Sequence, residues 1–167
     1  MMRIVFFDID GTLTRGVTSG AYLAGLLGHG RAMEEAEAAY ARGEIDNDEV
    51  CRIDAAGYAG RSRDELFGLL EDMPLVEGVR RAVEAVHAAG AEAHIASLAW
   101  GVVGEFLCAQ YGFDGYVGSE LEVADGVCTG GVARALESEG KCVYARELCA
   151  ARGIDPCACI AVGDSRS

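Results

Sequence analysis

The fold is decided near the start of the chain, where residues 3–12 read Arg3-Ile4-Val5-Phe6-Phe7-Asp8-Ile9-Asp10-Gly11-Thr12. The first part of this stretch is an unbroken apolar run, rich in β-branched and aromatic side chains. Such a run is typical of a parallel strand that is buried on both faces. It ends in two carboxylates and a glycine turn, at the strand end where open α/β sheets place their sites. We therefore expect an α/β fold, with a Rossmann-like parallel sheet and a site at Asp8 and Asp10.

The composition narrows the class of protein. The chain has 167 residues, a formal net charge of −13 and a hydrophobic fraction of 51%, which suits a single folded core with a modest insertion. The acidic excess repels phosphate backbones and anionic lipid, so we expect neither nucleic acid nor a membrane as partner. The sequence has no signal peptide, no apolar run near the ~20 residues of a membrane span, and scattered cysteines. These features predict a cytoplasmic protein with reduced thiols; they do not indicate its oligomeric state.

Residues 17–73 have no strand-like run and predict a small, all-helical cap inserted after the first strand. The expected helices are Ser19 to Leu27, Ala32 to Arg42, Asp46 to Ala56, and Ser62 to Glu71. Asp46 and Ser62 are typical N-cap residues, and Glu49 and Glu65 follow three positions later as capping-box partners. We call residues 17–73 the helical segment.

Strands and helices alternate again after the helical segment, so residues 1–16 and 74–167 are predicted to form the α/β core. The expected helices are Gly78 to Ala89, Gly101 to Tyr111 and Lys141 to Ala151, and the expected strands are Ala91 to Ser97, Gly115 to Val117, Leu121 to Val123, Val127 to Thr129 and Ala158 to Val162. The sequence Ala124-Asp125-Gly126 is a hairpin signal. Because the sequence stops soon after an apolar strand, we expect the C-terminal end of the core to be missing from it.

Chemically useful side chains stand at strand ends or at a helix start: Asp8, Asp10, Ser97, Lys141 and Asp164. Carboxylates at i and i+2 share a face of a strand, and with a third carboxylate they suit Mg²⁺. One carboxylate could attack phosphorus while a second protonates the leaving group and later activates water. Ser97 and Lys141 could then hold phosphoryl oxygens. Lys141 is the single lysine among 14 basic residues, and its compact ammonium is a point charge that arginine does not replace.

These residues, in this order, resemble the motifs of the haloacid dehalogenase superfamily of phosphatases. The run Asp8-Ile9-Asp10-Gly11-Thr12-Leu13-Thr14 resembles its first motif, DxDGT. Ile95-Ala96-Ser97 is similar to the second motif, Lys141 to the third, and Val162-Gly163-Asp164-Ser165 to the start of the fourth. The helical segment lies where this superfamily places its type 1 cap, and the whole arrangement is similar to the phosphoserine phosphatase branch.

The resemblance implies a Mg²⁺-dependent phosphomonoester hydrolase that acts on a small phosphorylated metabolite. By the same resemblance, Asp8 is the nucleophile that forms a phosphoaspartyl intermediate, and Asp10 is the general acid and base. Lys141 supports catalysis by binding the phosphoryl group. The implied metal-binding residues are Asp8, Asp10, through its backbone carbonyl, and Asp164. The implied phosphate-binding residues are Gly11, Thr12, Ser97 and Lys141.

The substrate is less well indicated than the chemistry. Phosphoserine phosphatases carry a glutamate where this chain has Val17, and two glycines where it has Leu98-Ala99-Trp100. Both differences count against phosphoserine. Arg52 lies near the position at which that branch uses an arginine for the substrate carboxylate, so Arg52 and Trp100 are candidate substrate contacts.

Two other functions remain open at this point. The same scaffold could transfer the phosphoryl group to an alcohol, as a phosphotransferase or phosphomutase. The chain could also keep the fold without turnover and serve as a regulatory or binding protein. A dehalogenase is disfavoured, because attack on an alkyl halide needs no leaving-group acid such as Asp10.

Overall fold

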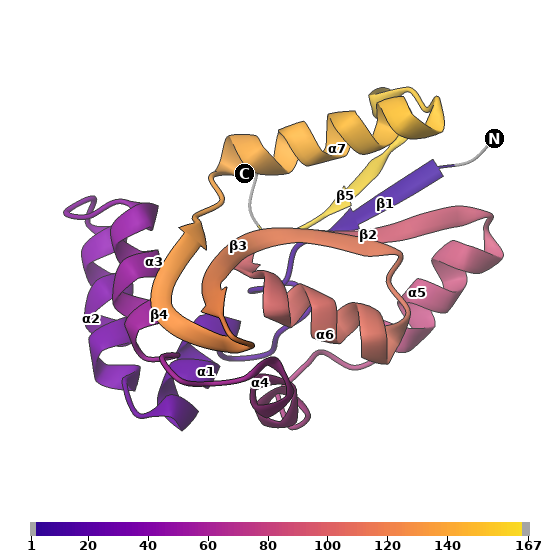
Figure 1. The fold of residues 1–167 in the computed structure, drawn as a ribbon. Coiled ribbons are helices and arrows are strands. Elements are labelled where there is room, and N and C mark those ends of the chain that lie inside the picture. Colours follow the sequence, from indigo (N-terminus) through magenta and orange to yellow (C-terminus); the bar gives the residue numbers. More distant parts are fainter. Residues whose placement is uncertain (1–2, 165–167) are drawn as a thin grey trace.

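The computed structural model describes residues 3–164, so Ser165 of the predicted fourth motif lies outside the described residues. These residues form one five-stranded sheet in the order β4-β3-β2-β1-β5 (Figure 1). The strands are β1 (Arg3–Phe7), β2 (Ala91–Trp100), β3 (Gly115–Ala124), β4 (Val127–Arg134) and β5 (Ile160–Val162). Strands β3, β2, β1 and β5 run parallel, and β4 is antiparallel to β3. The predicted α/β fold with a parallel sheet is therefore confirmed.

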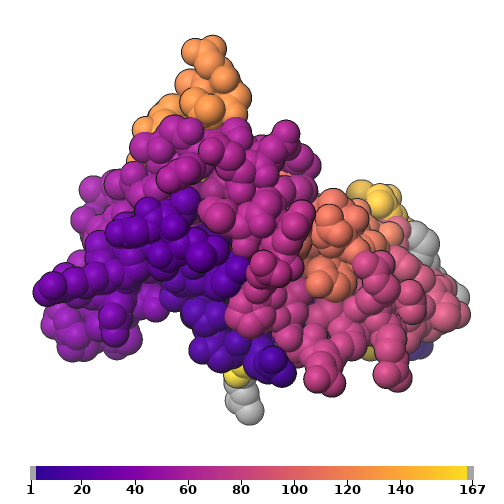
Figure 2. All heavy atoms as spheres, turned by 90° about the horizontal axis from the view of Figure 1, so that it is seen from below, coloured from indigo at the N-terminus to yellow at the C-terminus, as the bar shows by residue number. Residues whose placement is uncertain are grey.

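The helices lie on both faces of the sheet and beside one end of it. They are α1 (Ser19–Leu27), α2 (Gly30–Ala41), α3 (Asn47–Ala56), α4 (Arg63–Leu70), α5 (Val79–Ala88), α6 (Gly101–Tyr111) and α7 (Ser138–Arg152), with a 3₁₀ turn at Pro156–Ala158. Figure 1 shows α5 and α6 on one face, α7 on the other, α1 to α3 beside the carboxyl ends of the strands, and α4 next to α6. In the space-filling view, the helical segment and the pink part of the core around α5 and α6 lie side by side (Figure 2). Among the described helices, none has the length and apolar character needed to cross a membrane.

Strand β1 is buried on both faces, as its continuous apolar run predicts. Val5 and Phe7 pack in one apolar cluster with residues of α5 and α6. Ile4 and Phe6 pack in a second cluster with Cys149 of α7. Because successive side chains of a strand point to opposite faces, this one strand contributes to both layers of the core. It therefore fixes Asp8, the next residue, at the carboxyl edge of the sheet, between the neighbouring strands β2 and β5.

The two predicted N-caps of the helical segment are confirmed. The Ser62 side chain accepts from the backbone N–H of Glu65, and Glu65 accepts from Ser62, which completes a capping box at α4. The Asp46 side chain accepts from the backbone N–H of Glu49 at the start of α3. The Glu49 carboxylate, however, pairs with Arg52 one turn later along the same helix.

The hairpin predicted around Asp125-Gly126 is also confirmed. Asp125 and Gly126 have φ values of 51° and 81°, as a type I′ turn requires. The hairpin also holds the helical segment. The backbone N–H of Gly60 donates to the carbonyl of Cys128 at 2.8 Å, and the N–H of Cys128 donates to the carbonyl of Arg61 at 2.8 Å.

Several element boundaries differ from the prediction. Strand β2 continues three residues past Ser97, because Trp100 is buried and still pairs with Ser119 of β3. The two short strands expected at 115–117 and 121–123 form one strand, β3. Helix α7 begins three residues before Lys141, which therefore lies inside its first turns. The division into a core, residues 1–16 and 74–167, and the helical segment, residues 17–73, stays a prediction.

Truncation of a core side chain should lower the stability of the fold. Leu107 on α6 is fully buried, whereas Leu26 on α1 is 52% exposed. We expect Leu107→Ala to lower the free energy of unfolding by about 2–5 kcal/mol, through lost burial and a residual cavity. Leu26→Ala removes the same atoms from a site in water and should change it by less than about 0.5 kcal/mol. Urea unfolding of both variants measures this, and similar losses would contradict the assigned packing.

Candidate active site

The centre of the site is an ion pair between Asp8 and Lys141. The Lys141 Nζ donates to Asp8 Oδ2 at 2.9 Å, and the two side chains are only 11% and 18% exposed. The other carboxylate oxygen, Oδ1, accepts from the backbone N–H of Ile9 at 2.8 Å. The backbone N–H of Asp8 donates to the carbonyl of Val162 on β5 at 2.9 Å. The carboxylate is therefore held by Ile9 in the loop after β1 and by Lys141 of α7, while β5 holds the backbone of Asp8.

A cavity of about 240 Å³ is lined by both members of this pair. Its other walls come from β1, from the start of α7, from Ala96 of β2, and from β5 and Gly163. An anionic group that entered beside Asp8 would meet the ammonium of Lys141. In a strongly acidic protein this local positive charge is needed to bind a phosphoryl group.

The loop after Asp8 turns tightly around one carbonyl group. The backbone N–H groups of Thr12, Leu13 and Thr14 all donate to the carbonyl of Ile9, at 2.7 to 3.1 Å. Gly11 has a φ of 75°, a conformation that favours glycine. Its backbone N–H donates to Thr14 Oγ1 at 3.1 Å. Within the described chain, the hydroxyl of Thr12 is buried and makes no hydrogen bond.

Asp164 lies against this loop, at the position of Gly11. A Cβ at Gly11 would overlap the Asp164 Oδ2, so the absence of a side chain there makes room for the carboxylate. Asp164 itself is exposed. The structure therefore brings the predicted fourth-motif carboxylate to the first-motif loop that carries Asp8 and Asp10.

Asp10 points toward the helical segment. Its Oδ1 accepts from the backbone N–H of Ser19 at 2.6 Å, at the first residue of α1. Burial raises the pKa of Asp10 above its ordinary value of 3.8, the hydrogen bond from Ser19 opposes this, and the charges of Asp8 and Glu37 add to it. A carboxyl whose pKa is raised holds its proton to higher pH, which suits a group that must protonate a leaving alcohol.

The chemistry of these donors fits a hard cation. Carboxylate and carbonyl oxygens are the ligands that Mg²⁺ prefers. Within residues 3–164, no three Asp, Glu, His or Cys side chains gather as a metal cluster. The carboxylate of Asp10 is instead engaged by Ser19. The metal set implied by the resemblance, in which Asp10 contributes its carbonyl, remains a prediction.

Ser97 is placed differently from the prediction that it stands at a strand end. It lies inside β2, is 2% exposed, and its Oγ accepts from the backbone N–H of Ala99 at 3.3 Å. Among the described residues, no hydrogen bond joins the Ser97 hydroxyl to Asp8 or Lys141. The role of Ser97 in binding phosphate stays a prediction.

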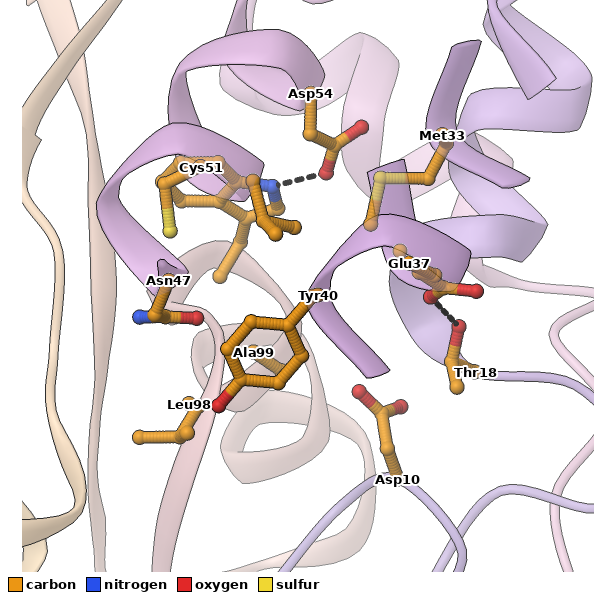
Figure 3. Close-up of a pocket in the computed structure, with 13 residues that line it drawn as sticks. Asp10, Thr18, Met33, Glu37, Tyr40, Asn47, Cys51, Asp54, Leu98 and Ala99 are labelled. Atoms are coloured by element: carbon orange, nitrogen blue, oxygen red, sulfur yellow. Dashed lines mark hydrogen bonds between the residues drawn. The ribbon is translucent and has the colours of Figure 1, made fainter. Parts of the chain in front are cut away.

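A second pocket, of about 220 Å³, lies between the helical segment and the end of β2 (Figure 3). The core contributes four residues to its lining, namely Asp10, Leu98, Ala99 and Trp100. Trp100, predicted as a substrate contact, thus reaches the pocket beside Asp10. Arg52 does not: its side chain is 67% exposed, pairs with Glu49 and lines a separate hollow on the outside of α3.

Two acidic residues of this pocket have no sequence signal that points to them. Asp54 of α3 is 2% exposed, and its carboxylate binds His29 Nε2 and Trp100 Nε1, each at 2.7 Å. Burial raises the pKa of Asp54, while these hydrogen bonds lower it. Glu37 of α2 also lines the pocket, and its Oε1 accepts from the Thr18 hydroxyl at 3.0 Å. Both read in the sequence as ordinary acids of a solvated helix.

Comparisons with known proteins agree on one family. A family model described as haloacid dehalogenase-like hydrolase matches residues 5–167. A phosphoserine phosphatase of Mycobacterium tuberculosis is 28% identical over 165 residues, which cover 97% of this chain and 40% of that protein. A phosphoserine phosphatase of Archaeoglobus fulgidus is 27% identical over 163 residues, which cover 97% of this chain and 47% of that protein.

A solved structure supports the same fold. A HAD family hydrolase from Salmonella enterica matches with a TM-score of 0.84 and 21% identity, covering 95% of this chain and 55% of that one. The chain thus spans about half the length of these three proteins. Because the family model matches nearly the whole sequence, the chain belongs to the haloacid dehalogenase-like hydrolase family.

Proposed function

We propose that the protein is a Mg²⁺-dependent phosphomonoester hydrolase that acts on a small phosphorylated metabolite. The observation that carries this proposal is the pairing of Asp8 with Lys141 at 2.9 Å, beside an acid whose pKa is raised, Asp10. A nucleophile, a fixed positive charge and a proton donor are the three groups that phosphoryl transfer through an aspartyl phosphate requires. The names of the similar phosphoserine phosphatases support the same class of reaction.

In the first step, a carboxylate oxygen of Asp8 forms a bond to phosphorus as the ester P–O bond breaks. Asp10 gives its proton to the departing alcohol oxygen, and Lys141 stabilises the negative charge on the phosphoryl oxygens. In the second step, Asp10, now ionised, takes a proton from a water molecule that attacks the phosphoaspartate. This releases inorganic phosphate and restores Asp8.

The remaining predicted residues are assigned supporting roles. Mg²⁺ would be held by the carboxylates of Asp8 and Asp164 and by the Asp10 carbonyl, and when bound it would offset charge on the phosphoryl group. The phosphate-binding roles are proposed for the loop and for β2, namely Gly11, Thr12 and Ser97. The helical segment 17–73 would act as a cap that keeps water from the reacting group. The seven free cysteines support a place in the cytoplasm.

Replacement of the nucleophile should abolish turnover. We expect Asp8→Asn to lower kcat for p-nitrophenyl phosphate with Mg²⁺ by at least about 1,000-fold, because an amide oxygen is a poor nucleophile. Asp48→Asn, on the first turn of α3, is the matched control and should keep normal activity. Retained turnover in Asp8→Asn would contradict the mechanism. Transfer of phosphate to added glycerol in preference to water would instead indicate a phosphotransferase.

The loss of activity on removal of the general acid should be larger for a poor leaving group than for a good one. Asp10→Asn should lower kcat/KM for an alkyl phosphate by about 100- to 10,000-fold. With p-nitrophenyl phosphate, whose leaving group departs without a proton, the variant should release one equivalent of nitrophenol in a burst and then stall, because Asp10 is still needed to activate water. Rapid-mixing absorbance measures the burst. Equal losses with both substrates and no burst would contradict this role.

The pH dependence of the wild-type enzyme follows from the same carboxyl. Burial raises the pKa of Asp10 above 3.8. Only the protonated form can donate to the leaving alcohol, so kcat/KM for an alkyl phosphate should fall as the pH rises through this raised pKa. The fall should be absent for p-nitrophenyl phosphate, measured over the same pH range in one buffer mixture.

Removal of divalent cations should stop the reaction. Treatment with EDTA should abolish turnover, and added Mg²⁺ should restore it, because the carboxylates and a carbonyl of the site suit that ion. Asp164→Asn should raise the Mg²⁺ concentration for half-maximal activity at least about 10-fold, since it removes a ligand charge. Full activity in EDTA would exclude the proposed metal.

A further inference from the structure

The pocket beside Asp10 carries negative charge and no positive charge. Its charged lining residues are Asp10, Glu37 and Asp54, and no described Lys, Arg or His lines it. His29 lies outside the lining, where it binds the buried Asp54. The leaving group of the proposed hydrolysis must occupy this pocket, because Asp10 lies in its wall and protonates the departing oxygen.

Glu37 is the acid in this pocket that is available to a ligand. Asp54 is committed, because its two oxygens bind His29 and Trp100. Glu37 accepts from the Thr18 hydroxyl through Oε1, and no ion pair joins it to a basic side chain within residues 3–164. Glu37, Asp10 and Tyr40 all line this pocket, and in Figure 3 the Asp10 carboxylate lies between the Tyr40 ring on one side and Glu37, hydrogen-bonded to Thr18, on the other.

The other residues of the pocket strengthen the interaction of Glu37 with a positively charged group. Met33, Val50, Leu98 and Trp100 supply apolar walls, and charge pairs are stronger where water is excluded. Tyr40 stands half-exposed at the pocket, and an aromatic face attracts ammonium groups.

A negatively charged leaving group would meet only repulsion. A carboxylate or second phosphate in this pocket would face the Glu37 carboxylate, and no described Lys, Arg or His lines the pocket to pair with it. Arg52, the predicted carboxylate contact, is turned outward and pairs with Glu49. Because such a charge would stay unpaired in a desolvated pocket, substrates with an anionic leaving group should bind poorly.

We propose that the substrate is the phosphate monoester of an amino alcohol, whose ammonium group binds the Glu37 carboxylate while its ester oxygen faces Asp10. This inference rests on the proposed function and names the substrate class of the same site. A leaving group such as ethanolamine or choline carries the positive charge that Glu37 requires and lacks the carboxylate that the pocket does not pair. It is also small enough for a pocket of about 220 Å³.

The test compares four phosphomonoesters of similar size with the full chain and Mg²⁺. They are phosphoethanolamine, phosphocholine, n-propyl phosphate, which has a methyl group in place of the ammonium, and phosphoglycolate, which carries a carboxylate; phosphoserine, which carries both an ammonium and a carboxylate, is measured beside them. We expect kcat/KM for phosphoethanolamine or phosphocholine to exceed that for n-propyl phosphate by about 10- to 100-fold, as for a charged hydrogen bond or ion pair. Phosphoglycolate and phosphoserine should be the poorest substrates.

The variant Glu37→Gln tests the assigned contact. The ratio of kcat/KM values between phosphoethanolamine and n-propyl phosphate should fall toward one, and this ratio cancels any general effect on the active site. Glu34→Gln, at an exposed position of the same helix, removes the same charge outside the pocket and should keep the wild-type ratio.

The outcomes separate the two proposals. Hydrolysis of p-nitrophenyl phosphate together with a preference for phosphoserine or phosphoglycolate would overturn the substrate class and leave the phosphatase intact. An unchanged ratio in Glu37→Gln would overturn the role of Glu37. Failure to hydrolyse any phosphomonoester with Mg²⁺, and failure to form a beryllium fluoride adduct on Asp8, would overturn both proposals.

Discussion

The arrangement of the site depends on one ion pair, between Asp8 at the end of β1 and Lys141 in the first turns of α7. The two residues are 133 positions apart in the sequence, so the pair exists only when β1 and α7 are packed together. Both charges are largely shielded from water, and each therefore requires the other. A phosphoryl group entering between them would find a nucleophile and its counter-charge already in place, which is the electrostatic preorganisation that catalysis needs.

A second set of contacts holds the helical segment against the core. Asp10 accepts from the backbone of Ser19 at the start of α1. Asp54 of α3 accepts from the indole of Trp100 at the end of β2, and the hairpin binds the backbone at Gly60. These contacts connect helices to the carboxyl edge of the sheet, so the same polar groups that hold the segment also form the walls of the pocket. If the leaving group binds there as proposed, substrate selection and attachment of the segment depend on the same residues.

Much of the fold was predictable because its signals are local. Apolar runs gave the parallel strands, Asp125-Gly126 gave the turn, and Ser62 and Asp46 gave the starts of two helices. The boundaries that were wrong depend on distant partners. Strand β2 continues beyond Ser97 because Trp100 pairs with β3. No sequence pattern within the strand indicates this contact.

The sequence by itself determined the chemistry: an acidic pair after a buried strand, a single lysine and a late carboxylate are residue types whose order is enough to indicate phosphoryl transfer. Only the tertiary structure decided what surrounds the leaving group. It turned Arg52 outward and brought Glu37 and Asp54 into the pocket. The physical reason is that a nucleophile loop is built from neighbouring residues, whereas the charge of a pocket depends on which faces of several helices pack against the sheet.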